Sequence, residues 1–178
     1  NLAAMNNLAN SYKTLYYYDK AQDLYLKIIK KDPLNLKTLN NYANLKRTWN
    51  DFDGAIDLYL KATKINPEEI NILFSLADSY QSIGDFKKSR EVIDRILRID
   101  PNKTSAHKLI SGFTNYHEGN KEHLDTMKNL LSKSDLTNNQ KIDLFFALGK
   151  AHEDLKDFDE SFQYLEKANF LKKEKSEY

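Results

Sequence analysis

The sequence predicts an all-α fold, a right-handed superhelical α-solenoid of about five antiparallel helix pairs. The chain has three prolines, and they recur at a fixed interval (67 − 33 = 34 and 101 − 67 = 34). Small residues recur at the same interval at Ala9, Ala43 and Ala77. A fixed period of this length is typical of a helical repeat array, in which each unit buries its apolar face against its neighbours.

Each of the first three units contains the patterns of two amphipathic helices. In the first unit, Met5, Leu8, Ala9 and Tyr12 follow the i, i+3, i+4, i+7 spacing of one helical face. The second helix of that unit presents Ala21, Tyr25 and Ile28. Small residues at fixed places let the two backbones approach each other, and the bulky residues fill the space between units. We therefore expect a helix A and a helix B in every unit.

Turn residues separate these helices. Gly84 is the clearest stop of a helix A, since glycine accepts a left-handed backbone. Each of the three units ends in Asp-Pro or Asn-Pro, where proline disfavours helix at the preceding residue. We interpret Asn66-Pro67-Glu68-Glu69 as an N-cap, a first helical residue and two acids favoured by the helix dipole.

The fourth unit departs from the pattern and the fifth recovers it. Residues 105–115 can form a helix A, but Gly119 arrives one residue later than the register of Gly84. A second helix at about 121–132 and a longer loop follow, and Thr137 with Gln140 forms a capping-box signature. We expect one array over residues 1–178, with units at about 2–35, 36–69, 70–103, 104–137 and 138–175.

Composition disfavours several classes of function. The net charge is +1, with 27 basic and 26 acidic residues, so no global field attracts nucleic acid or anionic membrane. No apolar run approaches the ~20 residues that span a bilayer. The absence of cysteine excludes disulfides and thiolate metal sites and fits a reducing, cytoplasmic location. The chain begins without methionine or a signal-like segment, and we interpret it as a fragment of a longer protein.

The positions that recur resemble the tetratricopeptide repeat (TPR) family. The resemblance rests on a bulky–small pair in helix A, a small residue early in helix B, an aromatic residue four positions on and a terminal proline. The first unit matches this pattern at Leu8-Ala9, Tyr12, Ala21, Tyr25 and Pro33. Two more units match in register, and the fifth matches at Leu148-Gly149, His152, Phe158, Ser161, Leu165 and Ala168. The resemblance implies that helix A lines the concave surface of the superhelix.

Residues that could support catalysis or metal binding lack the necessary spacing. His117 and His123 are six positions apart, and they form neither an i, i+4 zinc pair nor an HExxH motif. His107 and His152 occupy apolar columns, where we expect them to pack. No phosphate-binding glycine loop or nucleophile elbow occurs. We therefore expect no enzyme activity, no metal and no cofactor in this chain.

Polar residues recur on the other face of helix A and form the candidate site. Asn6, Asn7 and Asn10 recur as Asn40, Asn41 and Asn44. These positions alternate with the apolar face, so we expect them to point away from the core. Side-chain amides there could bind the backbone of an extended peptide, although a solvated face explains the pattern equally well. The candidate peptide-binding residues are Asn6, Asn10, Lys13, Asn40, Asn41, Asn44, Arg47, Phe74 and Asp78.

Three functions remain open at this point. The first is a protein-interaction scaffold that binds an extended peptide or partner segment in the concave groove. The second is the substrate-recruiting part of a larger transferase, since residues 140–173 resemble a repeat of bacterial TPR-containing sulfotransferases. The segments at 7–10 and 41–44 also resemble the TPR array of peptide O-GlcNAc transferases. The third is homo-oligomerisation through the terminal repeats, because uncapped ends of arrays associate.

Overall fold

The computed structural model describes residues 1–176, and the regular structure in that range is entirely helical. It contains ten α-helices and one short 3-10 helix, η1, which confirms the predicted all-α fold. The chain divides into two compact units, Asn1–Val92 and Ile93–Tyr178, with the boundary inside α6. We call them unit 1 and unit 2, and each is described by itself.

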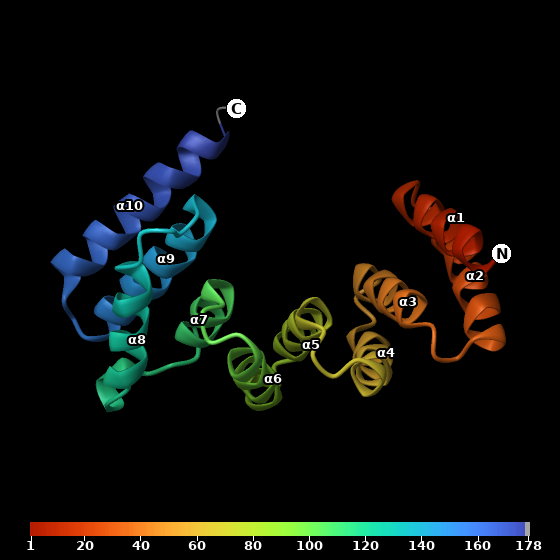
Figure 1. Ribbon diagram of the computed structural model, residues 1–178, viewed down its shortest axis with the longest axis horizontal. Helices are drawn as coiled ribbons and strands as arrows, with labels where there is room; N and C mark the ends of the chain where they lie inside the picture. The colour runs from red at the N-terminus through yellow and green to blue at the C-terminus, as the bar shows by residue number, and fades with distance from the viewer. Residues whose placement is uncertain (177–178) are drawn as a thin grey trace. The chain divides into compact units, whose positions relative to one another are not determined.

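Unit 1 contains two complete helix pairs, a further helix and the beginning of α6 (Figure 1). Its pairs are α1 with α2 and α3 with α4, while α2 also packs on α3 and α4 on α5. The helices are α1 (Leu2–Thr14), α2 (Tyr18–Lys31), α3 (Leu36–Thr48), α4 (Phe52–Ile65), α5 (Ile70–Ser82) and α6 (Phe86–Ile99).

The core of unit 1 is built from the residues that recur in the sequence. The small residues Ala9, Ala43 and Ala77 are fully buried, which lets neighbouring helices approach closely. Tyr25 and Tyr59, four positions after the small residues of helix B, are also fully buried. The spacing therefore identifies the packed face of each helix correctly.

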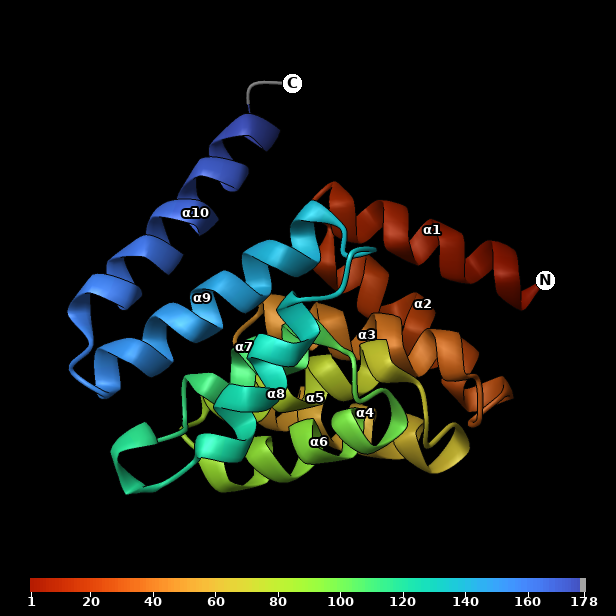
Figure 2. The same ribbon diagram turned by 60° about the vertical axis from the view of Figure 1, so that its left-hand side comes forward.

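Unit 2 is organised around one long helix, α9, which packs on α7, α8, η1 and α10. Helices α9 and α10 run side by side as an antiparallel pair joined by a short turn (Figure 2). The elements are α7 (Thr104–Ser111), η1 (Tyr116–Glu118), α8 (Lys121–Leu131), α9 (Asn138–Asp154) and α10 (Phe158–Ser176). Met127, Leu144 and Leu148 are among its fully buried side chains.

Two local predictions are wrong, and one is confirmed. Helix α7 ends at Ser111 and not at Asn115: Gly112 is its C-cap, and the Asn115 side chain accepts a hydrogen bond from the His117 N–H and begins η1. Helix α5 begins at Ile70, because Asn66 ends α4 and its side chain accepts from the Glu68 N–H, 3.2 Å away. The capping box between Thr137 and Gln140 opens α9 as predicted.

Four turns between helix A and helix B share one backbone motif. In each, a left-handed residue follows the end of the helix, and these residues are Tyr16, Asn50, Gly84 and Lys156. The next N–H bonds back to a carbonyl five residues earlier, as from Tyr17 to Tyr12 at 2.8 Å. This is the Schellman pattern of helix C-termini. The same turn therefore forms with and without glycine.

Tyr16 is the least suited of these residues, and its replacement by glycine is expected to stabilise unit 1. Its φ is 62° and its side chain is 78% exposed, so burial offsets little of the strain. We expect Tyr16→Gly to raise the free energy of unfolding by about 1 kcal/mol. Urea unfolding followed by the fluorescence of Trp49, the only tryptophan, measures this change.

Lys156→Gly is the matched control, because it relieves the same backbone strain in unit 2 and leaves the surroundings of Trp49 untouched. A decrease in stability on Tyr16→Gly would contradict the prediction. That outcome would show that the edge contact of Tyr16 with Tyr18, with ring centroids 6.0 Å apart, outweighs the strain.

Candidate functional site

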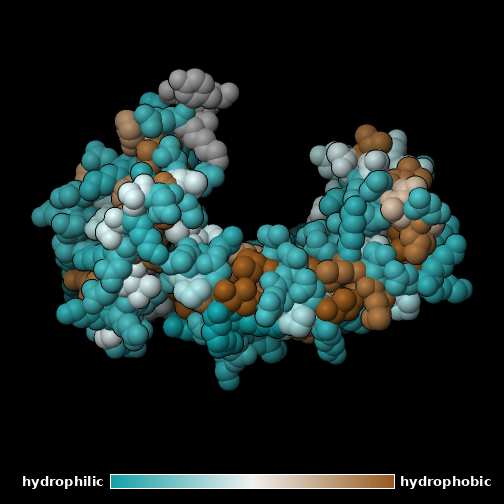
Figure 3. Space-filling view, in the orientation of Figure 1, coloured by the Kyte–Doolittle hydropathy of each residue, from teal (hydrophilic) through white to brown (hydrophobic). Residues whose placement is uncertain are grey.

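A polar pocket of about 550 Å³ opens in unit 1 at the C-terminal ends of α1, α3 and α5. Three predicted site residues, Lys13, Asn44 and Arg47, line it. Thr48, Phe52 and Ser82 complete the lining, and we call this the α3 pocket. In the view of Figure 3, hydrophilic side chains cover most of the surface, and hydrophobic ones appear in several separate patches.

Two buried tyrosines of helix B hold two asparagines of helix A in the same way. The Tyr25 hydroxyl donates to Asn10 Oδ1 at 2.5 Å, and the Tyr59 hydroxyl donates to Asn44 Oδ1 at 2.7 Å. Both pairs span 15 residues, so the interaction recurs with the repeat. Because the amide oxygens of Asn10 and Asn44 each accept a hydrogen bond from a tyrosine hydroxyl, the NH₂ groups of the two asparagines remain as donors that a ligand could use.

Burial keeps these phenols in their donor form. It raises the pKa of Tyr25 to about 12. It also raises the pKa of Tyr59, against the opposing effect of the Arg47 charge. Both hydroxyls therefore stay protonated over the physiological range, and the orientation of Asn10 and Asn44 does not change with pH there.

Arg47 joins α3 to α5 through an ion pair with Asp78. Both side chains are partly exposed, so the pair contributes little to stability and mainly fixes the guanidinium. Its Nε is buried and has no hydrogen-bond partner. Lys13 lies on the same pocket wall and adds a second positive charge.

Asn6 contradicts the expectation that the asparagines point away from the core. Its side chain is only 2% exposed, because α3 crosses over it. Its Oδ1 accepts from Thr38 Oγ1 and from Asn41 Nδ2, both at 3.3 Å. Its Nδ2 is buried without a partner. Asn6 and Asn41 therefore connect two helices, and Asn6 is not on the ligand face.

The remaining predicted residues, Asn40 and Phe74, are partly exposed on α3 and α5 and are not in the lining of the α3 pocket. Sequence reasoning missed Thr48 and Ser82, although a signal was present. Thr14, Thr48 and Ser82 form a hydroxyl column with the repeat period. Each hydroxyl donates to the carbonyl four residues earlier at 3.0 Å.

The lining of the α3 pocket is polar and positively charged. It combines cations, an oriented amide donor and hydroxyls, and its lining contains no histidine or carboxylate that could serve as a general base. Within residues 1–176, no group of three or more His, Cys, Asp or Glu side chains is placed to bind a metal ion. None of the helices in that range combines the length and apolarity that a membrane crossing requires.

The antiparallel helix pairs, the recurring small and aromatic columns and the shared turn define a helical repeat protein of the α-solenoid class. The chain belongs to the tetratricopeptide repeat family. Family profiles described as tetratricopeptide repeat match residues 1–31, 50–111 and 142–173. No curated protein sequence matches the chain significantly.

Solved structures share the fold over nearly the whole chain. A crystal structure of MamA superposes with a TM-score of 0.74 at 18% identity, covering 96% of this chain and 97% of that one. YrrB, described as a TPR protein with an unusual peptide-binding site, gives 0.69 at 17% identity, with coverage of 96% and 86%. A putative kinesin light chain from Podosopora anserina with TPR-like repeats gives 0.72 at 13%, with coverage of 98% and 96%. At these identities the likeness establishes the fold alone.

Proposed function

We propose that the chain is a non-catalytic protein-interaction scaffold whose α3 pocket binds an extended segment of a partner protein. The observation that carries the proposal is the repeated pairing of a buried tyrosine with an asparagine on helix A. Two amides fixed at the same place in successive units present their NH₂ groups at a regular interval. An extended peptide presents backbone carbonyls at a regular interval too, and these accept from such donors without regard to sequence.

The cations of the pocket support the same proposal. Lys13 and Arg47 lie beside the oriented Asn44, and their charge favours the carbonyl oxygens or carboxylates of a ligand. Preorganisation by Tyr59 reduces the side-chain entropy that Asn44 would lose on binding. YrrB, which has a similar fold, is described as having a peptide-binding site, and this supports the proposal.

Asn44→Ala is expected to weaken peptide binding about tenfold, the effect of one lost hydrogen bond of about 1.4 kcal/mol. A peptide selected against the wild-type chain from a random-peptide phage library provides the probe, and fluorescence anisotropy gives its Kd. Tyr59→Phe should weaken binding as well, because Asn44 loses the bond that orients it.

Asn129→Ala is the matched control, since Asn129 is an exposed asparagine of α8 in unit 2. Its Kd should equal that of the wild type. Equal affinity of the Asn44→Ala, Tyr59→Phe and wild-type chains for the selected peptide would sink the proposal. Circular dichroism on each variant ensures that only folded chains are compared.

A further inference from the structure

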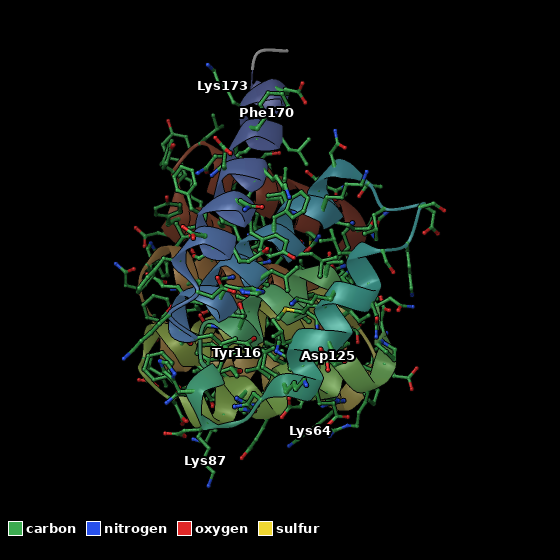
Figure 4. The ribbon with its side chains drawn as sticks, turned by 90° about the vertical axis from the view of Figure 1, so that its left-hand side faces the viewer. Lys64, Lys87, Tyr116, Asp125, Phe170 and Lys173 are labelled. Carbon is green, nitrogen blue, oxygen red and sulfur yellow. The ribbon has the colours of Figure 1, made fainter. Side chains whose placement is uncertain are left out.

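Three aromatic side chains form a hydrogen-bonded stack in unit 2 that the proposed function does not use. They come from three elements: His107 from α7, Tyr116 from η1 and His123 from α8. Figure 4 labels Tyr116 of η1 and Asp125 of α8. The ring centroids of His107 and His123 lie 5.3 Å apart and those of Tyr116 and His123 lie 6.0 Å apart, both stacked.

The hydrogen bonds of this stack have only one direction when both imidazoles are neutral. His107 Nε2 lies 2.9 Å from the Pro101 carbonyl oxygen, which can only accept, so Nε2 carries the hydrogen. His107 Nδ1 must then accept from His123 Nε2, 3.1 Å away. His123 Nδ1 accepts in turn from the Tyr116 hydroxyl at 2.7 Å. The Pro101 carbonyl thus determines the tautomers of His107 and His123 and makes the Tyr116 hydroxyl the donor to His123.

One added proton fits this arrangement, and a second does not. With a hydrogen on both nitrogens of His107, its Nδ1 donates to His123 Nε2. His123 then carries its own hydrogen on Nδ1 and donates to the Tyr116 oxygen, which can accept as well as donate. A second added proton places N–H groups on both facing nitrogens. Two like-charged rings would then meet across 3.1 Å with no acceptor between them.

The groups around His107 and His123 act in both directions on the positive charge that these two imidazoles can hold. Burial lowers the pKa of His107, while its bond to the Pro101 carbonyl and the charge of Asp100 oppose that change. Glu122 of α8 lines a pocket of about 300 Å³ together with both imidazoles. From α9, Asp143 reaches α7, where it binds Lys108. Other charged or titratable groups lie close to the two histidines in the sequence. Helix α6 carries Arg95 and Arg98, η1 carries His117 and Glu118, Lys103 precedes α7, and Lys121 begins α8.

We propose that His107 and His123 form a proton-operated latch between α7 and α8, closed with up to one added proton and open with two. Both helices pack on α9, and the latch bonds them to each other through side chains. In the open state each imidazole returns to water and its ordinary pKa near 6.5. Because the open state binds more protons, acidification below that value favours it.

Hydrogen–deuterium exchange of α8 tests the latch. After correction for the intrinsic exchange rate, its protection should fall about tenfold for each pH unit between roughly pH 6 and pH 5, for one extra proton bound on opening. Amides of α10, which packs on α9 away from the latch, should change less. Unchanged protection of α8 over this range would overturn the proposal.

His107→Gln is the informative variant. Glutamine can donate to the Pro101 carbonyl and accept from His123, but it does not titrate, so α8 should stay protected at about pH 5. His117→Gln, at an exposed histidine of η1, should behave as the wild type. Loss of protection in His107→Gln equal to that of the wild type would refute the latch.

Proton NMR of the wild-type histidines gives a test that needs no variant. The latch predicts that His107 and His123 titrate in two separate steps, with one step displaced below the ordinary range. Two independent titrations near 6.5 would overturn it, whatever the stability of the variants.

Discussion

Tyr59→Ala is expected to remove about 3–5 kcal/mol from the stability of unit 1. The ring is fully buried in the core of the unit, where it contacts the small residues that let α3, α4 and α5 approach. Truncation leaves a cavity that these helices cannot fill without moving apart. It also leaves Asn44 Oδ1 without the hydroxyl that it accepts from. A loss of this size is a large part of the 5–15 kcal/mol typical of a whole domain.

Urea unfolding followed by Trp49 fluorescence measures the loss, because the only tryptophan lies in unit 1. Tyr59→Phe separates the two contributions: it keeps the ring and should cost about 1 kcal/mol for the hydrogen bond. Leu34→Ala, at an exposed side chain of the same unit, should change the midpoint little. If Tyr59→Ala unfolds at the same urea concentration as Leu34→Ala, the tyrosine column does not hold the repeat together.

Most of the fold could be predicted from the sequence because its determinants recur. Ala9, Ala43 and Ala77 fall on one face of successive helices, and close packing demands small residues there. The turn motif was recognisable at Gly84 but hidden at Tyr16 and Lys156, where the residue type gives no hint of a left-handed backbone. The short α7 was also not predicted, although Gly112, which follows its last residue, is a residue type typical of helix ends.

The candidate site was only half predictable, for a geometric reason. Helical periodicity places Asn6, Asn10 and Lys13 on the polar side of α1, but it cannot say which of them the next helix covers. The packing of α3 buries Asn6 and leaves Lys13 in the pocket wall. The tyrosine–asparagine pairs were not predicted, because each joins residues 15 positions apart on different helices.

The comparisons test the predicted family but not the finer resemblances. The tetratricopeptide repeat family was predicted and is confirmed. The likeness of residues 140–173 to sulfotransferase repeats and of the asparagine segments to O-GlcNAc transferase arrays stays a prediction, as does self-association through the terminal repeats. The role proposed for the α3 pocket does not depend on which of these holds, because its donors and cations belong to unit 1 itself.

Gly149→Val is expected to destabilise unit 2 by about 3 kcal/mol. Gly149 occupies the column filled by Ala9, Ala43 and Ala77 in unit 1, but here a methyl group would meet the side chain of Leu165, which would have to shift. A Cβ at this position would lie 2.8 Å from Leu165 Cδ2 and 2.9 Å from its Cγ. The close approach of α10 is also held by Ser161, whose hydroxyl donates to the Gly149 carbonyl at 2.9 Å. A branched side chain therefore has to displace Leu165 from its packing between α9 and α10.

The double variant Gly149→Val with Leu165→Ala identifies the cause, because it removes the atoms that the new side chain meets. Urea unfolding followed by circular dichroism should show the double variant to be more stable than the sum of the two single losses, with a coupling of about 1 kcal/mol or more. Gly112→Ala is the matched control: its φ is −66° and a Cβ there approaches nothing closer than 3.4 Å. That change should be neutral or slightly stabilising, since alanine loses less backbone entropy on folding than glycine does. Strictly additive losses in the double variant would show instead that the new side chain destabilises unit 2 without meeting Leu165.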